Sequence, residues 1–142
     1  MPTGSRSNDR LVDTSVAVAL VVADHAAHQP TTAALEGRRL GLAGHAAFET
    51  FSVLTRLPPP ARRTEAAVAR LLAADFPITC FLGPAAALDL FGRLGPLRLA
   101  GGSVYDALVA ATASEHGITL VTRDRRALGT YRALEVDVEL LA

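Results

Sequence analysis

Four acidic residues, far apart in the sequence, fall near the points where strand-like runs pass into helices: Asp13, Glu49, Asp106 and Asp124. Carboxylates gathered at one edge of a sheet repel one another unless a divalent cation lies between them. Mg²⁺ and Mn²⁺ are hard cations that prefer oxygen ligands and retain several waters. A bound water of lowered pKa can attack a phosphodiester without a nucleophilic side chain. The pattern therefore predicts a metal-dependent site that cleaves phosphodiesters.

Other chemistries match the sequence less well. The four histidines show no zinc-like spacing with Cys80, and no serine stands in a Gly-x-Ser-x-Gly elbow. A phosphoacceptor domain usually uses a lysine, and the chain has none. A dehalogenase-type phosphatase needs a second Asp two residues after Asp13, where this chain has Ser15. Both of these enzyme classes are disfavoured.

Each acid also has a simpler interpretation. Asp13 and Asp124 could be helix N-caps, and Glu49 could be a solvated residue in the middle of its helix. Ser103 could cap a helix, with Asp106 three residues later as in a capping box. Three of the acids are nevertheless expected at the edge where an open parallel sheet binds its ligands, so together they favour a site.

The composition indicates one compact domain. The chain has 142 residues, half of them hydrophobic, and we expect a flexible leader at 1–9 and a single domain at 10–142. The formal net charge is zero, so a nucleic acid would have to be held by a local basic face. A lone cysteine, Cys80, favours a reducing cytoplasm, and the apolar run at 16–23 is far shorter than the ~20 residues that span a bilayer.

Strand-like and helical patterns alternate along the sequence. Strands are predicted at 10–13, 40–43, 77–82, 118–122 and 136–140. Helices are predicted at 15–23, 28–37, a segment ending near Arg56, a segment opened by Thr64, 85–94, 103–116 and 124–131. This alternation predicts an α/β fold of right-handed β-α-β units, with a mostly parallel sheet covered on both faces.

Four segments together resemble the PIN-domain ribonucleases of the VapC toxin family. They are Val-Asp-Thr-Ser at 12–15, Phe-Glu-Thr-Phe at 48–51, Gly-Ser-Val-Tyr-Asp-Ala-Leu-Val-Ala-Ala at 102–111 and Leu-Val-Thr-Arg-Asp at 120–124. Each segment is weak alone, but their order is specific, and a Leu-Pro-Pro-Pro break follows the helix that carries Glu49. The resemblance spans nearly the whole chain and implies a PIN-like three-layer α/β/α domain.

The resemblance also implies roles for particular residues. Asp13, Glu49, Asp106 and Asp124 would form the catalytic acidic pocket. Of these, Asp13, Asp106 and Asp124 would bind Mg²⁺ or Mn²⁺. Thr14, Ser15 and Thr122 would be nearby polar support.

The resemblance further implies an RNA-cleaving toxin that forms a homodimer and is inhibited by a VapB-type antitoxin. DNA would be reached only through the antitoxin, and no membrane is involved. Among arginines near the expected pocket, Arg123 and Arg125 flank Asp124 and are the preferred RNA contacts, although single arginines are often ordinary solvated surface. The few aromatic residues argue against broad base stacking as the main source of affinity. The alternative function is a non-catalytic PIN-like module that binds RNA or antitoxin.

Overall fold

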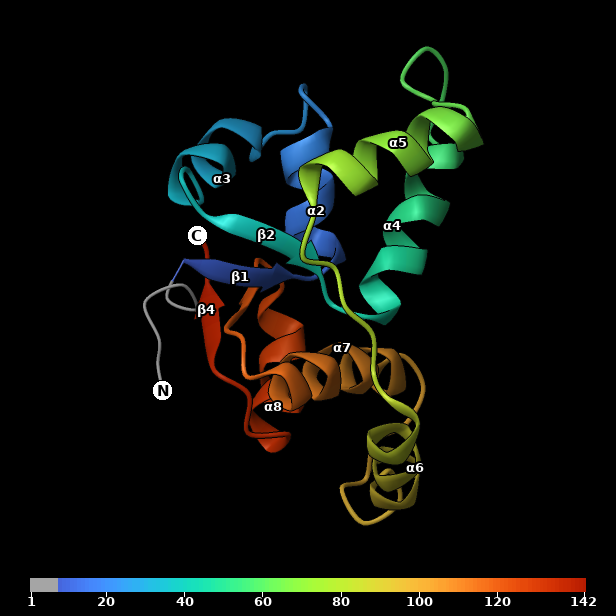
Figure 1. The fold of residues 1–142 in the computed structure, drawn as a ribbon, viewed down its shortest axis with the longest axis vertical. Coiled ribbons are helices and arrows are strands. Elements are labelled where there is room, and N and C mark those ends of the chain that lie inside the picture. Colours follow the sequence, from blue (N-terminus) through green and yellow to red (C-terminus); the bar gives the residue numbers. More distant parts are fainter. Residues whose placement is uncertain (1–7) are drawn as a thin grey trace.

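The computed structural model describes residues 8–142 and contains one parallel sheet between two layers of helices (Figure 1). Its four strands are β1 (Asp9–Val12), β2 (Arg39–Leu42), β3 (Leu120–Thr122) and β4 (Val138–Leu140). They lie in the order β2-β1-β3-β4, and every pairing is parallel. This confirms the expected α/β/α architecture. Residues 1–7 of the expected leader lie outside the described residues, whereas Asp9 already belongs to β1.

The helices divide between the two faces of the sheet. On one face lie α2 (Thr14–Val21), α3 (His28–Ala34), α4 (His45–Thr55) and α5 (Glu65–Asp75). On the other lie α6 (Pro84–Arg93), α7 (Ser103–His116) and α8 (Leu128–Ala133), the last preceded by a short 3₁₀ turn at Arg125–Ala127. Within the part of the chain that the structure describes, no helix combines the length and apolarity needed to cross a membrane.

Two hydrophobic cores explain why the central strands β1 and β3 each carry consecutive apolar residues. Leu11 and Leu120 are fully buried in the core on the α7 side. Their chain neighbours Val12 and Val121 are fully buried in the core on the α2 side. Successive side chains of a strand point to opposite faces, so a sheet covered on both faces needs apolar residues at every position.

Local sequence signals set several helix ends. Thr64 Oγ1 accepts a hydrogen bond from the Ala67 amide at 3.2 Å and caps α5. Gly117 ends α7 with a left-handed φ of 65°, a conformation that glycine adopts without strain. The expected cap by Ser103 is wrong, because Gly102 is the N-cap residue and no side chain caps this end. Ser103 instead occupies the first helical position.

The predicted strand at 77–82 is also wrong. This segment follows the edge of β2, where the amides of Ile78 and Cys80 donate to the carbonyls of Leu40 and Leu42. Between them, however, the Leu42 amide is bound by the Thr79 hydroxyl rather than by a backbone carbonyl. Only one isolated bridge, between Ala43 and Cys80, therefore forms.

Candidate active site

Asp13 follows β1 and caps α2, so the N-cap interpretation is confirmed. Its Oδ1 accepts from the Ser15 hydroxyl at 2.6 Å and from the Val16 amide at 3.3 Å. Its Oδ2 accepts from the hydroxyls of Thr122, through a short bond, and Tyr131, at 2.8 Å. Burial raises the pKa of Asp13, and these four hydrogen bonds oppose that rise by stabilising the anion. The network fixes the carboxylate at the carboxyl edge of the sheet.

Tyr131 is the member of this network that sequence reasoning missed. It lies on α8, 118 positions from Asp13, and its side chain is buried. Burial and the charge of Asp13 raise the pKa of its phenol, so it remains a protonated hydrogen-bond donor. No spacing in the sequence relates the two residues, because only the packing of α8 beside the sheet brings them together.

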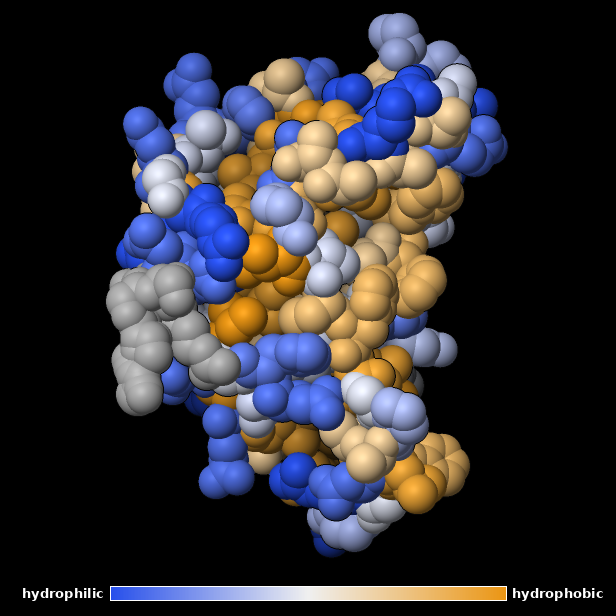
Figure 2. All heavy atoms as spheres, viewed as in Figure 1, coloured by the Kyte–Doolittle hydropathy of each residue, from blue (hydrophilic) through white to orange (hydrophobic). Residues whose placement is uncertain are grey.

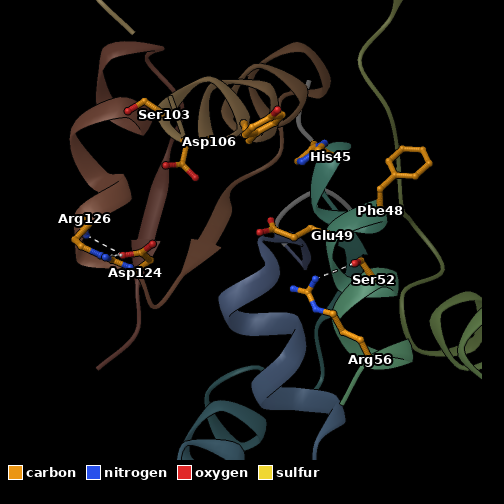
Figure 3. Close-up of a pocket in the computed structure, with 11 residues that line it drawn as sticks. His45, Phe48, Glu49, Ser52, Arg56, Ser103, Asp106, Asp124 and Arg126 are labelled. Atoms are coloured by element: carbon orange, nitrogen blue, oxygen red, sulfur yellow. Dashed lines mark hydrogen bonds and ion pairs between the residues drawn. The ribbon is translucent and has the colours of Figure 1, made fainter. Parts of the chain in front are cut away.

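Glu49 lies on α4 and faces the acids contributed by the other side of the cavity (Figure 3). The Thr14 hydroxyl donates to Glu49 Oε1 at 2.8 Å. Thr14 thus links the start of α2 to α4, while Ser15 and Thr122 bind Asp13. All three residues predicted as polar support contact a carboxylate of the acidic group.

Asp106 projects from the first turn of α7. Its pKa is raised, first by burial and then by the negative charges of Asp124, Asp13 and Glu49, while Arg126 lowers it. The repulsion shows that the four acids share one electrostatic environment, as the sequence predicts. An added positive charge would relieve that repulsion.

Asp124 follows β3 and caps the 3₁₀ turn by accepting from the Arg126 amide at 2.9 Å. The Arg126 guanidinium also approaches Asp124 Oδ1 at 3.5 Å, as marked in Figure 3. Asp124 is therefore both an N-cap and a member of the acidic group. The two interpretations left open by the sequence coexist here.

Two cavities meet at this group of acids. The smaller, of 230 Å³, is lined by all four: Asp13, Glu49, Asp106 and Asp124, together with Thr14, Ser15, Val109 and Tyr131. The larger, of 780 Å³, is lined by Glu49, Asp106 and Asp124 and by His45, Phe48, Ser52, Arg56, Gly102, Ser103, Tyr105 and Arg126. The tertiary structure thus gathers all four predicted acids around the smaller cavity, and three of them also line the larger one.

The donor chemistry fits a hard divalent cation, because the group consists of carboxylates that repel one another. Within residues 8–142, however, no three Asp, Glu, His or Cys side chains lie close enough to form a complete ligand group. Mg²⁺ commonly keeps several waters and binds through one or two carboxylates plus substrate phosphates. The arrangement suits that mode of binding rather than an all-protein cage.

The predicted arginines are placed differently from the acids. Arg123 donates to Thr31 Oγ1 at 3.2 Å and to the carbonyl of Ala142 at 2.8 Å, so its side chain ties the C-terminal end to α3. Arg125 is exposed but lines neither cavity. Arg56 and Arg126 line the larger cavity instead. In the sequence, both arginines stand near the loops around the acids, but several other arginines do so as well. Their position along the chain therefore does not single them out.

Comparisons with known proteins identify the family of the chain. A family model described as PIN domain matches residues 10–133. Ribonuclease VapC27 of Mycobacterium tuberculosis is 44% identical over 131 residues, which cover 92% of this chain and 96% of that protein. Ribonuclease VapC40 of the same species is 45% identical over 135 residues, covering 91% and 96%.

Similar folds occur among solved structures. FitAcB from Neisseria gonorrhoeae has a TM-score of 0.64 at 21% identity, covering 91% of this chain and 95% of that chain. FitAB bound to an IR36 DNA fragment has a TM-score of 0.63 at 20% identity, covering 92% and 94%. At these identities the likeness concerns the fold alone.

Proposed function

The chain belongs to the VapC-type ribonucleases of the PIN domain family, and from this membership we propose that it is a toxin that hydrolyses RNA with Mg²⁺ or Mn²⁺. The observation that carries the proposal is the shared cavity of Asp13, Glu49, Asp106 and Asp124, in which mutual repulsion raises the pKa of Asp106. Repelling carboxylates are unfavourable in a metal-free protein and useful in one that binds a divalent cation. A purely structural set of caps would not need to converge in this way.

Within the proposed site, Asp13, Asp106 and Asp124 would hold the cation, one or two of them directly and the others through retained waters. The hydrogen bonds from Ser15 and Thr122 keep Asp13 in place. When bound, the ion supplies an activated water and neutralises charge on the scissile phosphate. Glu49, oriented by the Thr14 hydroxyl, faces the cavity and is placed to accept a hydrogen bond from the attacking water. Each carboxylate thus has a position maintained by neighbouring hydroxyls or helix ends.

Arginines supply the proposed contacts to the RNA backbone. Arg126 and Arg56 line the larger cavity on two sides of the acids, so they are placed to bind phosphates next to the scissile one. The guanidinium of Arg125 lies in the same turn as Arg126 and can bind phosphate farther out. For Arg123 we propose an indirect contribution, because its side chain holds the C-terminal end.

The proposed partners follow from family membership. We expect a VapB-type antitoxin to cover the acidic cavity, a homodimer to be the active assembly, and the protein to work in the cytoplasm. The FitAB structure contains DNA. For this chain we propose that DNA is reached only through the antitoxin.

A cleavage assay tests the proposed activity. The antitoxin-free protein is incubated with structured transfer, ribosomal and messenger RNAs in Mg²⁺ or Mn²⁺, and the cut ends are mapped. Discrete cuts should disappear with EDTA and in Asp106→Asn. The matched control is Asp89→Asn, which removes a carboxylate that is 71% exposed on α6 and should cleave normally.

Two results would contradict the proposal. If Asp106→Asn cleaves RNA at the wild-type rate, the acidic site is not the catalytic site. A folded protein that binds Mn²⁺ but cuts none of the RNAs would favour the alternative, a non-catalytic module that binds RNA or antitoxin.

A further inference from the structure

An aromatic pair, half-buried His45 and exposed Tyr105, lines the larger cavity. The rings of His45 on α4 and Tyr105 on α7 stack with centroids 4.8 Å apart and planes inclined by 21°. Tyr105 remains 54% exposed although His45 covers part of its ring. A pair this open contributes little to a hydrophobic core, so its exposed surface is available to a ligand.

Both rings adjoin residues of the acidic group. Tyr105 directly precedes Asp106, and His45 lies one helical turn before Glu49. In Figure 3 the His45 ring and the Glu49 carboxylate point to the same side of α4, whereas Phe48 points away from the acids. Phe48 instead packs against Phe81, with centroids 5.6 Å apart. Within the larger cavity, the His45–Tyr105 pair is therefore the aromatic surface on the side of the acids.

The side chains on the cavity side of α4 change in type along the helix. His45 is followed by Glu49, then by Ser52, and then by Arg56 beyond the last turn. The Arg56 guanidinium donates to the Ser52 hydroxyl at 3.3 Å, so it lies along the helix surface. From His45 to Arg56 the helix extends about 16 Å at 1.5 Å per residue, longer than one nucleotide. The His45 ring, the Glu49 carboxylate and the Arg56 guanidinium thus follow one another along the helix, over a length that matches a few nucleotides.

We propose that the His45–Tyr105 pair stacks one unpaired nucleobase of the substrate, whose backbone continues over the acids toward Arg56. This inference rests on the proposed ribonuclease function and adds a contact that would hold the base beside the cut. Bases in a duplex are covered by their neighbours, whereas splayed bases stack on aromatic side chains. The 780 Å³ cavity has the size of small-molecule sites and leaves room for a nucleotide beside the acids.

The pair fits a base better than an apolar protein segment. One of its rings is an imidazole, and the surrounding cavity carries carboxylates and arginines. Apart from Phe48, which lines the same cavity and packs against Phe81, the large exposed apolar side chains lie elsewhere. Phe81, Leu88 and Phe91 are exposed on and before α6, where Figure 2 shows hydrophobic residues gathered at the lower right. A protein partner would bury more apolar area there than at the aromatic pair.

A binding experiment without cleavage tests this inference. The full-length chain carrying Asp106→Asn is titrated against fluorescein-labelled hexamers of U, A, C and G, and against versions with one abasic nucleotide at each position. Adding Tyr105→Ala should weaken binding about 5- to 150-fold, the range for loss of one base–aromatic stack. Tyr105→Phe keeps the ring and should bind nearly as the parent does.

The combination of both changes identifies the stack. At one position of the hexamer, an abasic nucleotide should weaken binding to the parent. The same abasic nucleotide should hardly weaken binding to Tyr105→Ala further, because that variant has already lost the stacking contact. The control Phe91→Ala removes an aromatic side chain that is 75% exposed on α6 and should bind as the parent does. Circular dichroism melts verify that each variant is folded.

Several results would overturn the inference. These are equal affinities of Tyr105→Ala and its parent, additive effects of Tyr105→Ala and every abasic position, or no binding of any hexamer. Additive effects would assign the aromatic pair to a protein partner or to helix packing. Failure of the ribonuclease proposal is separate, because cleavage is measured on the chain with an intact Asp106, and base stacking is measured without cleavage.

Discussion

Replacing Tyr131 with phenylalanine removes one hydroxyl from the buried network around Asp13 and should destabilise the protein at neutral pH. The Tyr131 side chain is only 1% exposed, and its hydroxyl donates to Asp13 Oδ2 at 2.8 Å. The phenylalanine ring fills the same space, so the change deletes a hydrogen bond and leaves the packing nearly intact. The variant therefore isolates the contribution of the hydroxyl.

The expected magnitude follows from the remaining donors. A hydrogen bond to a charged group contributes about 1.5–3 kcal/mol to stability. Ser15, Val16 and Thr122 still donate to Asp13 in the variant, so we expect the lower half of this range, about 1.5–2 kcal/mol. For a chain of this size each kcal/mol lowers the melting temperature by about 2–4 °C, which gives a decrease of about 3–8 °C.

The effect should depend on pH in a defined direction. Burial raises the pKa of Asp13 in the folded protein, and the Tyr131 hydroxyl partly opposes this by stabilising the anion. Without the hydroxyl the folded pKa rises further, so the variant loses more stability than wild type as the pH rises through it. The difference should be largest at pH 7 and shrink as the pH falls toward the ordinary carboxyl value of about 3.9.

Urea unfolding between pH 7 and pH 4, on metal-free protein, measures this difference. Tyr105→Phe is the matched control, since it removes a phenol that is 54% exposed and should change the free energy of unfolding by less than about 0.5 kcal/mol. A Tyr131→Phe protein as stable as wild type at pH 7, or a deficit that is constant with pH, would refute the reasoning.

Other substitutions test separate features of the fold and the site. In EDTA, Asp106→Asn should raise the melting temperature, because it removes a carboxylate whose pKa is raised by burial and by three neighbouring acids. An unchanged or lower melting temperature would contradict the mutual repulsion. Thr50→Val should raise the free energy of unfolding in urea by about 1 kcal/mol, because among the described residues only the Thr50 hydroxyl is buried without a hydrogen-bond partner. Gly41→Ala should lower it by about 1–3 kcal/mol, since the new Cβ would lie 2.4 Å from the backbone carbon of Ile78. In contrast, Gly92→Ala on α6 should raise it by up to about 1 kcal/mol, because no described atom outside its own helix turn lies within 4 Å of the new Cβ.

Local patterns were sufficient where one physical requirement dominated. The central strands β1 and β3 carry consecutive apolar residues because both of their faces are buried, whereas β4 at the edge is half-buried and alternates apolar and acidic residues. The bounds of α7 were predicted correctly because Gly117 ends the helix. The predicted strand at 77–82 failed because its β-favouring residues do pack beside β2, but the Thr79 side chain replaces a backbone partner. Propensity does not reveal which atom will satisfy a particular amide.

The site shows the same division between local and long-range information. The sequence alone predicted Asp13, Asp106 and Asp124 from strand ends and a helix start that a parallel sheet brings to one edge. The roles of Glu49 and of the three hydroxyl residues followed from the resemblance to VapC-type PIN domains. Only the tertiary structure decided that Tyr131 completes the Asp13 network, that Arg123 turns toward Ala142, and that Arg126 approaches Asp124. Strand ends have a fixed direction set by the backbone, whereas a side chain on a helix can reach any partner that packing provides. The acids and the neighbouring hydroxyl residues could therefore be predicted from the sequence, whereas the partners Tyr131 and Arg126 could not.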